Sequence, residues 1–526
     1  MSSGCLSAFL CYNCSIWYGM LRFLALIRSP FVLDLRALAL LRAAVAAVIL
    51  LDLGIRATDL EAHYSNMGVL PLSVLYDKMW NPYQFSLHNS SGLWQVQALL
   101  FLFSAAVAVS LLLGHYTRLS TFLSWVLLIS VQNRNPMIVQ GGDDLLRMLL
   151  FWGLFLPWGR VYSLDARKQP APAQLSYFSA ATVAYIVQIA LVYWCTALLK
   201  SSPEWNRDGT ALYYALSLDQ VLMPGGRLLY QFPKVMHFLT LATYYTELLL
   251  PFLLFLPFRV TWWRFLFVFI IYGFHLGISL TLFVGLFFLI NMASVLGLLP
   301  PAALDWLEKR IVPRAQQLGP RVASRFASLQ PKWVAWRQSI GLRVETSWTL
   351  SDRLRRLVRH VREGIVVGVL LYVCWWNLDS IVLPRYTMSE PMRWLGYLVR
   401  VDQHWGMFAP SVFKDDGWYI LDGTTTTGQH LDLNRNGAPL TYAKPASVVS
   451  LFKNDRWRKY SENYLFVNNA YMRPYYCNYL LRIWHENPHH LPLKQLEVIY
   501  MKEVTQPNYQ PVTPKREVLC GCAPSQ

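Results

Sequence analysis

Long apolar runs recur along the first 305 residues of the chain. A helix needs about 20 apolar residues to cross a hydrocarbon core of about 30 Å. About eight runs approach that length before residue 305, and another follows a polar stretch: 36–55, 93–113, 117–131, 143–158, 177–199, 235–257, 261–280, 283–300 and 364–383. The pattern predicts an all-α polytopic membrane bundle of about eight or nine transmembrane helices.

The chain changes character after residue 384. Short segments of alternating apolar and polar residues, such as Trp418–Asp422 and Gln495–Tyr500, are separated by Gly, Asn and Pro and predict strands. We therefore expect four regions: the bundle at 1–305, a basic segment at 306–362, a final transmembrane helix at 363–384 and a small β-rich external domain at 385–526.

Composition agrees with a membrane protein, and the charge distribution predicts its orientation. Hydrophobic residues make up 55% of the chain, charged residues 15%, and the net charge is +17. The basic residues concentrate between Glu308 and Arg362, and positive loops stay on the cytoplasmic side. With nine spans, this predicts a cytoplasmic N-terminus and an extracytoplasmic C-terminal domain. Anionic lipid is the expected partner of the basic segment, because the sequence offers no motif for reading nucleic acid.

Lys200 follows the apolar run 177–199 and is the main candidate for a catalytic base. Its amine is placed where a membrane helix meets water, and partial desolvation favours the neutral amine that can accept a proton. The structural alternative is a lysine that extends its ammonium group to the membrane interface. Glu204 and Trp205 follow closely and are candidates for positioning the amine.

A second polar group, Gly141–Arg147, begins the fourth apolar run. Asp143 or Asp144 at a helix N-terminus would cap the helix and complement its dipole. Asp143 also precedes Arg147 by four residues, so the two side chains could form a salt bridge on one helix face. A supporting role in a site and a purely structural role are both open for these residues.

Two further ionisable residues lie within apolar runs, where burying them is costly. His275 and Ser279 share one helix face, either as site residues or as hydrogen-bonded packing residues. Glu247 needs a partner, for which Arg147 or a tyrosine hydroxyl is a candidate.

Two closely spaced cysteine pairs do not predict a metal site. Cys11 and Cys14, and likewise Cys520 and Cys522, lack further ligands at the spacing of a zinc site. The second pair is a candidate for an external disulfide.

Four stretches, in order along the chain, carry a family resemblance: Tyr162-Ser-Leu-Asp165, Leu198-Leu-Lys-Ser-Ser-Pro-Glu-Trp205, Phe274–Phe287 with its histidine, and Asp402–Pro410 followed by Asp416-Gly-Trp418. Together they resemble the vitamin K-dependent gamma-carboxylases. The last stretch is typical of the bacterial branch, the HTTM (horizontally transferred transmembrane) domain proteins. The resemblance extends over most of residues 30–500.

The resemblance implies a membrane enzyme that couples oxygenation of a reduced quinone to proton abstraction. In such carboxylases a lysine deprotonates a reduced vitamin K or menaquinone-type quinol, O2 reacts, and the resulting base removes a γ-proton from glutamate before CO2 adds. Membrane quinone, lipid, and a protein or peptide substrate at the outer face are the implied partners. Lys200 and His275 would be catalytic, supported by Asp143, Asp144, Arg147, Glu204, Trp205 and Ser279.

The competing interpretation is a non-catalytic membrane scaffold that binds quinone or lipid and docks its basic segment on anionic headgroups. It predicts that Lys200→Ala leaves function unchanged, whereas charge reversal at Arg353, Arg355 and Arg356 abolishes it.

Overall fold

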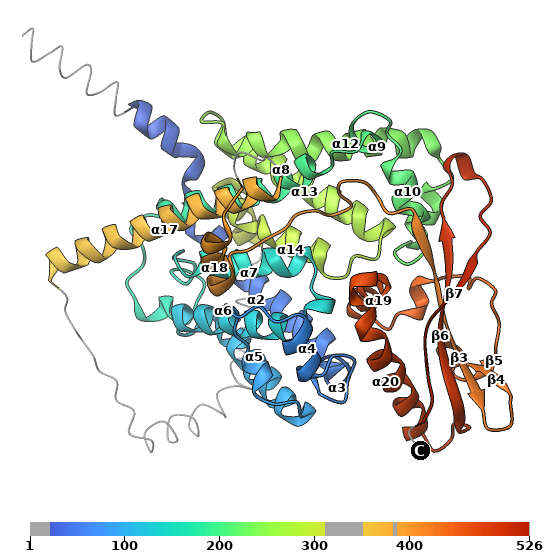
Figure 1. Cartoon of the computed structure of the whole chain (residues 1–526). Helices are drawn as coiled ribbons and strands as arrows, with labels where there is room; N and C mark the ends of the chain where they lie inside the picture. The colour runs from blue at the N-terminus through green and yellow to red at the C-terminus, as the bar shows by residue number, and fades with distance from the viewer. Residues whose placement is uncertain (1–21, 311–350, 382–386, 525–526) are drawn as a thin grey trace, which may run out of the picture.

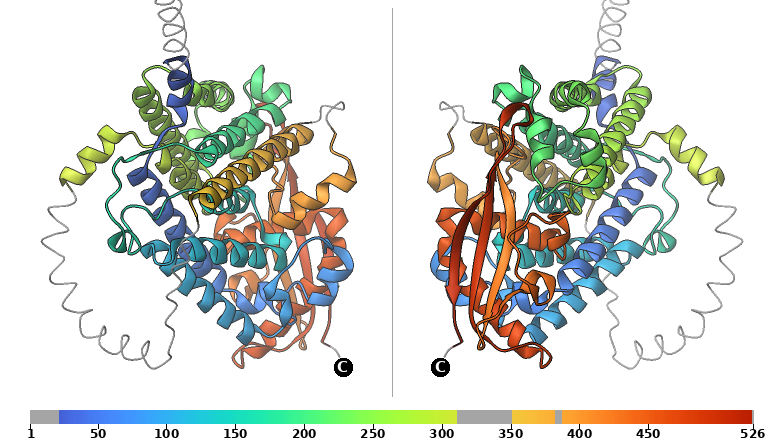
Figure 2. Two further views of the ribbon diagram at one scale, coloured as in Figure 1. Left: turned by 90° about the vertical axis from the view of Figure 1, so that its left-hand side faces the viewer. Right: turned by 90° about the vertical axis from the view of Figure 1, so that its right-hand side faces the viewer.

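The computed structural model describes residues 22–310, 351–381 and 387–524 and has two parts (Figure 1). Most of it is a helical bundle, and the C-terminal part contains a five-stranded antiparallel sheet. Figure 2 shows this sheet as an outer layer on one side of the molecule. Helices α19 (Asp455–Leu465) and α20 (Arg473–Glu486) lie between the sheet and the bundle.

The bundle is built from long helices joined by short ones. The long elements are α2 (Leu35–Ala57), α5 (Trp94–Leu113), α6 (Thr117–Arg134), α7 (Gly141–Gly153), α8 (Ala180–Leu199), α12 (Pro233–Leu249) with η5 (Leu250–Phe255), α13 (Val260–Thr281), α14 (Phe287–Ser294) and α17 (Asp352–Ser380). The short helices are α3 (Leu60–Tyr64), α4 (Leu72–Lys78), α9 (Pro203–Asn206), α10 (Ala211–Ser217) and α11 (Pro224–Leu229).

Five of the described helices are long and apolar enough to cross a membrane: α2, α5, α8, α12 with η5, and α13. A sixth crossing requires α14 and the helix at Pro301–Arg310 to act together, although they are bent by 104°. The expected eight or nine spans therefore exceed the five or six that length and composition support. Helix α7 has only 13 residues, which corresponds to about 20 Å of rise, and α6 ends in the polar sequence Gln132-Asn-Arg134.

Polar side chains mark where the bundle helices begin. Asp34 precedes α2 and accepts a hydrogen bond from the backbone N–H of Arg36 at 2.8 Å. Ser179 precedes α8 and forms a reciprocal capping box with Thr182. These bonds satisfy N–H groups that the first turn of a helix leaves without partners. The caps therefore set the starting points of two helices that contribute to the buried core.

The C-terminal sheet has the strand order β5-β4-β3-β6-β7, and every neighbouring pair is antiparallel. The predicted strand segments Trp418–Asp422 and Gln495–Tyr500 fall within β3 and β6, which confirms the β-rich C-terminal region. The element bounds are α18 (Glu390–Val399), β3 (Asp415–Thr425), β4 (His430–Asp432), β5 (Ala438–Pro439), β6 (Leu493–Val504) and β7 (Lys515–Cys522); a small separate sheet pairs β1 (Leu33–Asp34) with β2 (Ser176–Tyr177).

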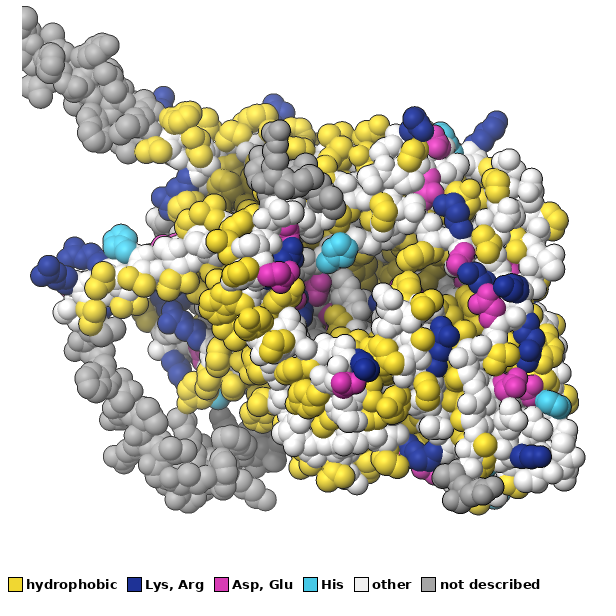
Figure 3. Space-filling model, viewed as in Figure 1, with side chains coloured by type: hydrophobic (Ala, Val, Ile, Leu, Met, Phe, Trp, Pro, Cys, Tyr) yellow, Lys and Arg dark blue, Asp and Glu magenta, His cyan; other side chains and the backbone are white. Residues whose placement is uncertain are grey.

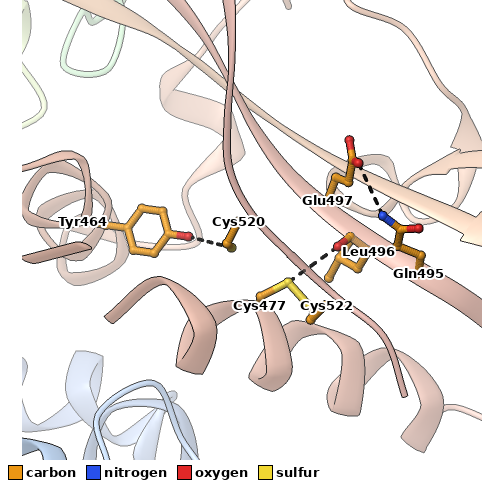
Figure 4. The surroundings of a disulfide bond; sticks show 7 residues. All are labelled: Tyr464, Cys477, Gln495, Leu496, Glu497, Cys520 and Cys522. Carbon is orange, nitrogen blue, oxygen red and sulfur yellow. Dashed lines mark hydrogen bonds between the residues drawn. A yellow bond between two sulfur atoms is a disulfide. The ribbon is translucent and has the colours of Figure 1, made fainter. Parts of the chain in front are cut away.

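A disulfide joins α20 to β7, but it is not the one suggested by the sequence. Cys477 pairs with Cys522, whereas Cys520 is a free thiol whose Sγ lies 3.1 Å from the hydroxyl of Tyr464 (Figure 4). Cys520 and Cys522 lie in one extended strand, and Cys522 instead reaches a cysteine on the helix packed against that strand. The other cysteine pair, Cys11 and Cys14, lies outside the described residues.

Candidate active site

Lys200 forms a buried ion pair with Glu247. The lysine caps the C-terminal end of α8, and its Nζ lies 2.5 Å from Oε2 of Glu247 on α12. The two residues are only 3% and 6% exposed, so the amine does not extend into solvent. The partner proposed for Glu247 from the sequence, Arg147 or a tyrosine, is therefore corrected to Lys200. Pairing with Glu247 offsets part of the cost of burying the charge of Lys200.

Trp205 covers the amine, and Glu204 holds the segment that carries Trp205. The Nζ of Lys200 lies 4.4 Å from the centroid of the Trp205 ring, a cation–π distance. The Trp205 Nε1–H donates to the carbonyl oxygen of Phe408 at 3.0 Å. Glu204 points the other way and accepts hydrogen bonds from the backbone N–H of Val412 and from Lys414 Nζ. Glu204 thus ties this segment to the C-terminal part and does not pair with Lys200.

His275 lies deep in α13 and contacts α8. Its Nε2 is 3.1 Å from the hydroxyl of Tyr193, which precedes Lys200 by about two helical turns. The ring is 1% exposed, and its Nδ1 has no hydrogen-bond partner among the described residues. Ser279 donates to the carbonyl oxygen of Leu276 in its own helix at 2.8 Å. Ser279 does not line the cavity that contains His275.

One large cavity connects most of these residues. It has a volume of about 1330 Å³ and reaches from α8, α12 and α13 to the C-terminal part. Lys200, Trp205, Glu247 and His275 all line it. Figure 3 shows a hollow near the centre of one face, where acidic side chains and a histidine gather beside apolar surface. Since ligand pockets commonly measure about 300–1,000 Å³, the cavity has room for a large ligand.

The acidic pair at the start of α7 has two separate roles. Asp144 lines the cavity and pairs with Arg147 at 3.0 Å. Asp143 instead contacts Arg56 and Arg456, at 2.7 Å and 2.6 Å, and does not line the cavity. The expected salt bridge between Asp143 and Arg147 is therefore wrong. Within α7, Arg147 pairs with Asp144, three residues before it. Asp143 pairs instead with Arg56 and Arg456, which are distant in the sequence.

The segment 402–410 lines the cavity between the bundle and the sheet. Residues 404 and 406–409 of this segment contribute to the cavity wall. Gln403 anchors the segment, because its Oε1 accepts a hydrogen bond from Gln188 of α8 at 2.7 Å. The Trp405 Nε1–H donates to the same oxygen at 3.1 Å. A stretch noted in the sequence only as part of a family resemblance is therefore also part of the cavity.

Two residues that contact the predicted site residues directly were not predicted as part of the site: Glu247, which pairs with Lys200, and Tyr193, which contacts His275. The sequence singles out Glu247 only for its cost in lipid, and it does not single out Tyr193. Two signals were available for them. Glu247 is a carboxylate in an otherwise apolar run, and Tyr193 lies about two turns before Lys200, on the same helix face.

Asp416 brings a further ionisable group to the cavity from β3. It is 2% exposed, and its Oδ2 accepts a hydrogen bond from the backbone N–H of Asp219 at 2.5 Å. Burial raises the pKa of Asp416 to about 7, and the negative charge of Asp219 adds to the shift. Lys444 lies 2.5 Å from the Asp219 carboxylate and partly offsets this repulsion. We therefore expect the contact between Asp219, which lies between α8 and α12, and Asp416 of the sheet to depend on pH.

We expect Asp416→Asn to weaken the pH dependence of stability. Because the folded-state pKa of Asp416, about 7, is above its ordinary value of 3.8, its favourable contribution is present below about pH 4 and is lost as the pH rises through 7. Wild-type stability should therefore fall relative to Asp416→Asn between pH 5 and 8, by at most about 1.4 kcal/mol per pH unit. Thermal unfolding in nanodiscs across this range measures the difference. Asp415→Asn, at the exposed neighbour, is the control, and parallel curves for wild type and Asp416→Asn would contradict the assignment.

The fold and cavity define a mostly helical protein whose five or six long apolar helices indicate a multi-pass membrane protein. Comparisons of this chain with known protein families, curated proteins and solved structures found no match. Within residues 22–310, 351–381 and 387–524, no group of three or more His, Cys, Asp or Glu side chains is placed to hold a metal ion.

Proposed function

We propose that the protein is a membrane-embedded enzyme of the vitamin K-dependent gamma-carboxylase type, with Lys200 as its general base. The observation that carries the proposal is the Lys200–Glu247 pair in the wall of a large, mainly apolar cavity. Buried ionisable pairs of this kind are costly and concentrate at functional sites. The resemblance of the residues around Lys200 and His275 to that family supports the same assignment.

The cavity fits a reduced vitamin K or menaquinone-type quinol. Its volume of about 1330 Å³ accommodates a bicyclic head and a chain, and its walls combine apolar side chains with a few polar groups. The Nδ1 of His275, which has no hydrogen-bond partner within the described parts of the chain, is available to a polar group of the head. When bound, the quinol would supply four electrons to O2, so that one oxygen atom ends in a quinone epoxide and the other in water; the water takes up one quinol proton and the proton abstracted from a substrate C–H, and Lys200 takes the other quinol proton.

Lys200 and Glu247 would act together on the quinol proton. The base must be a free amine, so the proton that the pair shares would lie on Glu247, as a carboxylic acid, before the reaction. When Lys200 accepts the quinol proton, the carbonyl oxygen of Glu247 would accept a hydrogen bond from the resulting ammonium. Trp205 shields the amine from solvent, and His275, oriented by Tyr193, would hold the head group.

The substrate that loses the C–H proton would enter from the C-terminal part. There the cavity wall carries Arg473, whose positive charge suits an acidic protein or peptide substrate; Arg458 and Lys502 also line the wall but pair with Glu462 and Asp415. CO2 addition to such a substrate would complete a glutamate carboxylation.

We also infer that α17 crosses the membrane and that the C-terminal part is extracytoplasmic. Helix α17 lies parallel to α8. Glu363, the twelfth of its 29 residues, accepts a hydrogen bond from the backbone N–H of Ala180 at the start of α8. Further along α17, Trp376 donates to the carbonyl oxygen of Gln403, whose side chain is bound by Gln188 further along α8. The chain therefore returns to the end of the bundle that carries Lys200. The basic residues around 308–310 and 353–362 belong to the opposite end, which favours a cytoplasmic location for it.

The proposal predicts that Lys200→Ala lowers O2-dependent turnover of a reduced menaquinone analogue by roughly 10²- to 10⁴-fold, the usual contribution of a general base. Purified protein in nanodiscs would be assayed for epoxide and for oxidised quinone. The matched control is Lys234→Ala, at an exposed lysine of α12. Equal background consumption of the quinol by wild type and Lys200→Ala would reject the catalytic assignment.

A quinone- or lipid-binding scaffold is the second candidate. The observation in its favour is that Lys200 already has a carboxylate partner at 2.5 Å, as a purely structural lysine would. In that case wild type binds the quinone analogue without turning it over, and Lys200→Ala leaves binding intact.

A further inference from the structure

The cavity reaches the outer surface of the bundle part-way along α13. Phe269 lies near the middle of this 22-residue helix, lines the cavity and is 68% exposed. Gly273 and Gly277, one and two turns further on, also line the cavity and are exposed. A Cβ atom added at either glycine would meet no atom within 4 Å. The wall of the cavity is therefore open along this side of α13.

Helix α12 lines the other side of this opening, and α12 and α13 pack against different neighbouring helices. Helix α12 packs on α8 and α10, whereas α13 packs on α14 and α11. Both contribute cavity-lining residues, and within their candidate spans only 28% of residues are buried. Thr240, Thr243 and Thr246 form the α12 side of the wall. The α12 side of the cavity thus carries three threonines, whereas the α13 side is mainly apolar, with two glycines, and has His275 and Thr281 as its polar residues.

We propose that the gap between α12 and α13 is a lateral entrance through which the chain of a membrane-soluble ligand passes, with the polar head at Lys200 and His275. The inference rests on the proposed function for the identity of the head, a quinol. The position of the gap within the membrane determines which ligand can occupy it. An opening near the middle of a membrane-spanning helix faces hydrocarbon, so an apolar chain can lie across it without being exposed to water.

The length of this part of α13 and the position of the His275 Nδ1 atom agree with this arrangement. Phe269 and Thr281 are separated by about 18 Å along the axis of α13, a length that suits a chain of several isoprene units. His275 belongs to the same stretch of helix and is 1% exposed, with Nδ1 lacking a partner among the described residues. A ligand lying along α13 would therefore place its chain at the glycines and its head beside this nitrogen.

The test is to fill the opening without disturbing the fold. Because neither glycine has an atom near its missing side chain, Gly273→Leu and Gly277→Leu should be accommodated, and leucine favours a helix more than glycine does. Gly364→Leu and Gly368→Leu are matched controls, since these glycines of α17 also have no atom within 4 Å and do not line the cavity.

The first readout is labelling, which does not depend on turnover. A naphthoquinone with a polyprenyl chain that carries a photoreactive diazirine would be added to the protein in nanodiscs and cross-linked. We expect labelled peptides from α12 and α13 in wild type and in the α17 controls, and about tenfold less labelling in the α13 variants, equivalent to roughly 1.4 kcal/mol of binding. Unchanged labelling in both α13 variants would overturn the entrance, whether or not the protein is an enzyme.

The second readout compares two quinols, one with a polyprenyl chain and one without. The α13 variants should raise the KM of the chain-bearing quinol about tenfold relative to that of the short one, again roughly 1.4 kcal/mol. An equal change for both quinols would mean that the leucines disturb the head site, and would reject the entrance. Absence of turnover in wild type would reject the proposed function instead, and the labelling result would still decide the entrance.

Discussion

Glu247→Leu is expected to destabilise the protein by about 3–5 kcal/mol, because it leaves Lys200 buried without its opposite charge. The pair is almost fully enclosed, and Nζ and Oε2 are 2.5 Å apart, so water cannot replace the carboxylate. Turnover of a reduced quinol should also be lost. The ammonium that forms when Lys200 takes the quinol proton would have no oxygen of Glu247 to accept its hydrogen bond, and a buried charge without a partner is costly.

The double variant Lys200→Met/Glu247→Leu separates stability from catalysis. Replacing a buried ion pair by apolar side chains of similar size is often neutral or stabilising, so the double variant should regain most of the lost stability while remaining inactive. Thermal unfolding and quinol turnover in nanodiscs measure the two effects. Glu61→Leu is a control, since Glu61 pairs with Arg482 at a partly exposed position and should cost less than about 1 kcal/mol. A double variant that turns over quinol like wild type would show that the pair has no part in the chemistry.

The bundle could be predicted from the sequence to the extent that its helices are exposed to lipid. Helices α5 and α13 are predominantly apolar, so hydropathy identifies them directly. Helix α7 also reads as an apolar run, yet it is short and mostly enclosed by other helices. An apolar sequence suits the interior of a helical bundle as well as it suits lipid, so hydropathy alone overestimates the number of spans.

Candidate residues could be identified individually, but their partners could not. The cost of burying a charge singles out Lys200, Glu247 and Asp143 from the sequence. Spacing along one helix then suggests local partners, such as Arg147 for Asp143. In the fold, both carboxylates pair with residues far away in the chain, Glu247 with Lys200 and Asp143 with Arg456. Such pairings depend on the docking of whole helices, which no local pattern encodes.

The contact of Arg456 with the bundle is the clearest case of such docking. Arg456 belongs to α19, and its guanidinium reaches Asp52 of α2 at 2.7 Å and Asp143 of α7 at 2.6 Å. Arg56 binds the same two carboxylates, each at 2.7 Å, and is fully buried. Two positive and two negative charges thus balance within one buried cluster that joins the C-terminal part to the bundle.

We expect Arg456→Met to cost about 3–5 kcal/mol, the penalty for removing one partner from a buried ionic cluster. The variant keeps the volume of the side chain but leaves two carboxylates facing one guanidinium. It should also weaken the docking of α19, so that limited proteolysis cuts between the bundle and the sheet more rapidly than in wild type. Thermal unfolding in nanodiscs and the rate of proteolysis are the two measurements.

Arg516→Met is the matched control, because Arg516 pairs with Glu497 on the surface of the sheet at 3.0 Å. A pair that remains hydrated contributes at most about 1 kcal/mol, so the control should unfold and be cleaved almost like wild type. If Arg456→Met behaves like Arg516→Met, the cluster does not hold the two parts together. If it is destabilised as expected, the wall of the cavity that α19 and the sheet provide depends on this cluster, and quinol turnover should fall in Arg456→Met although Arg456 does not line the cavity.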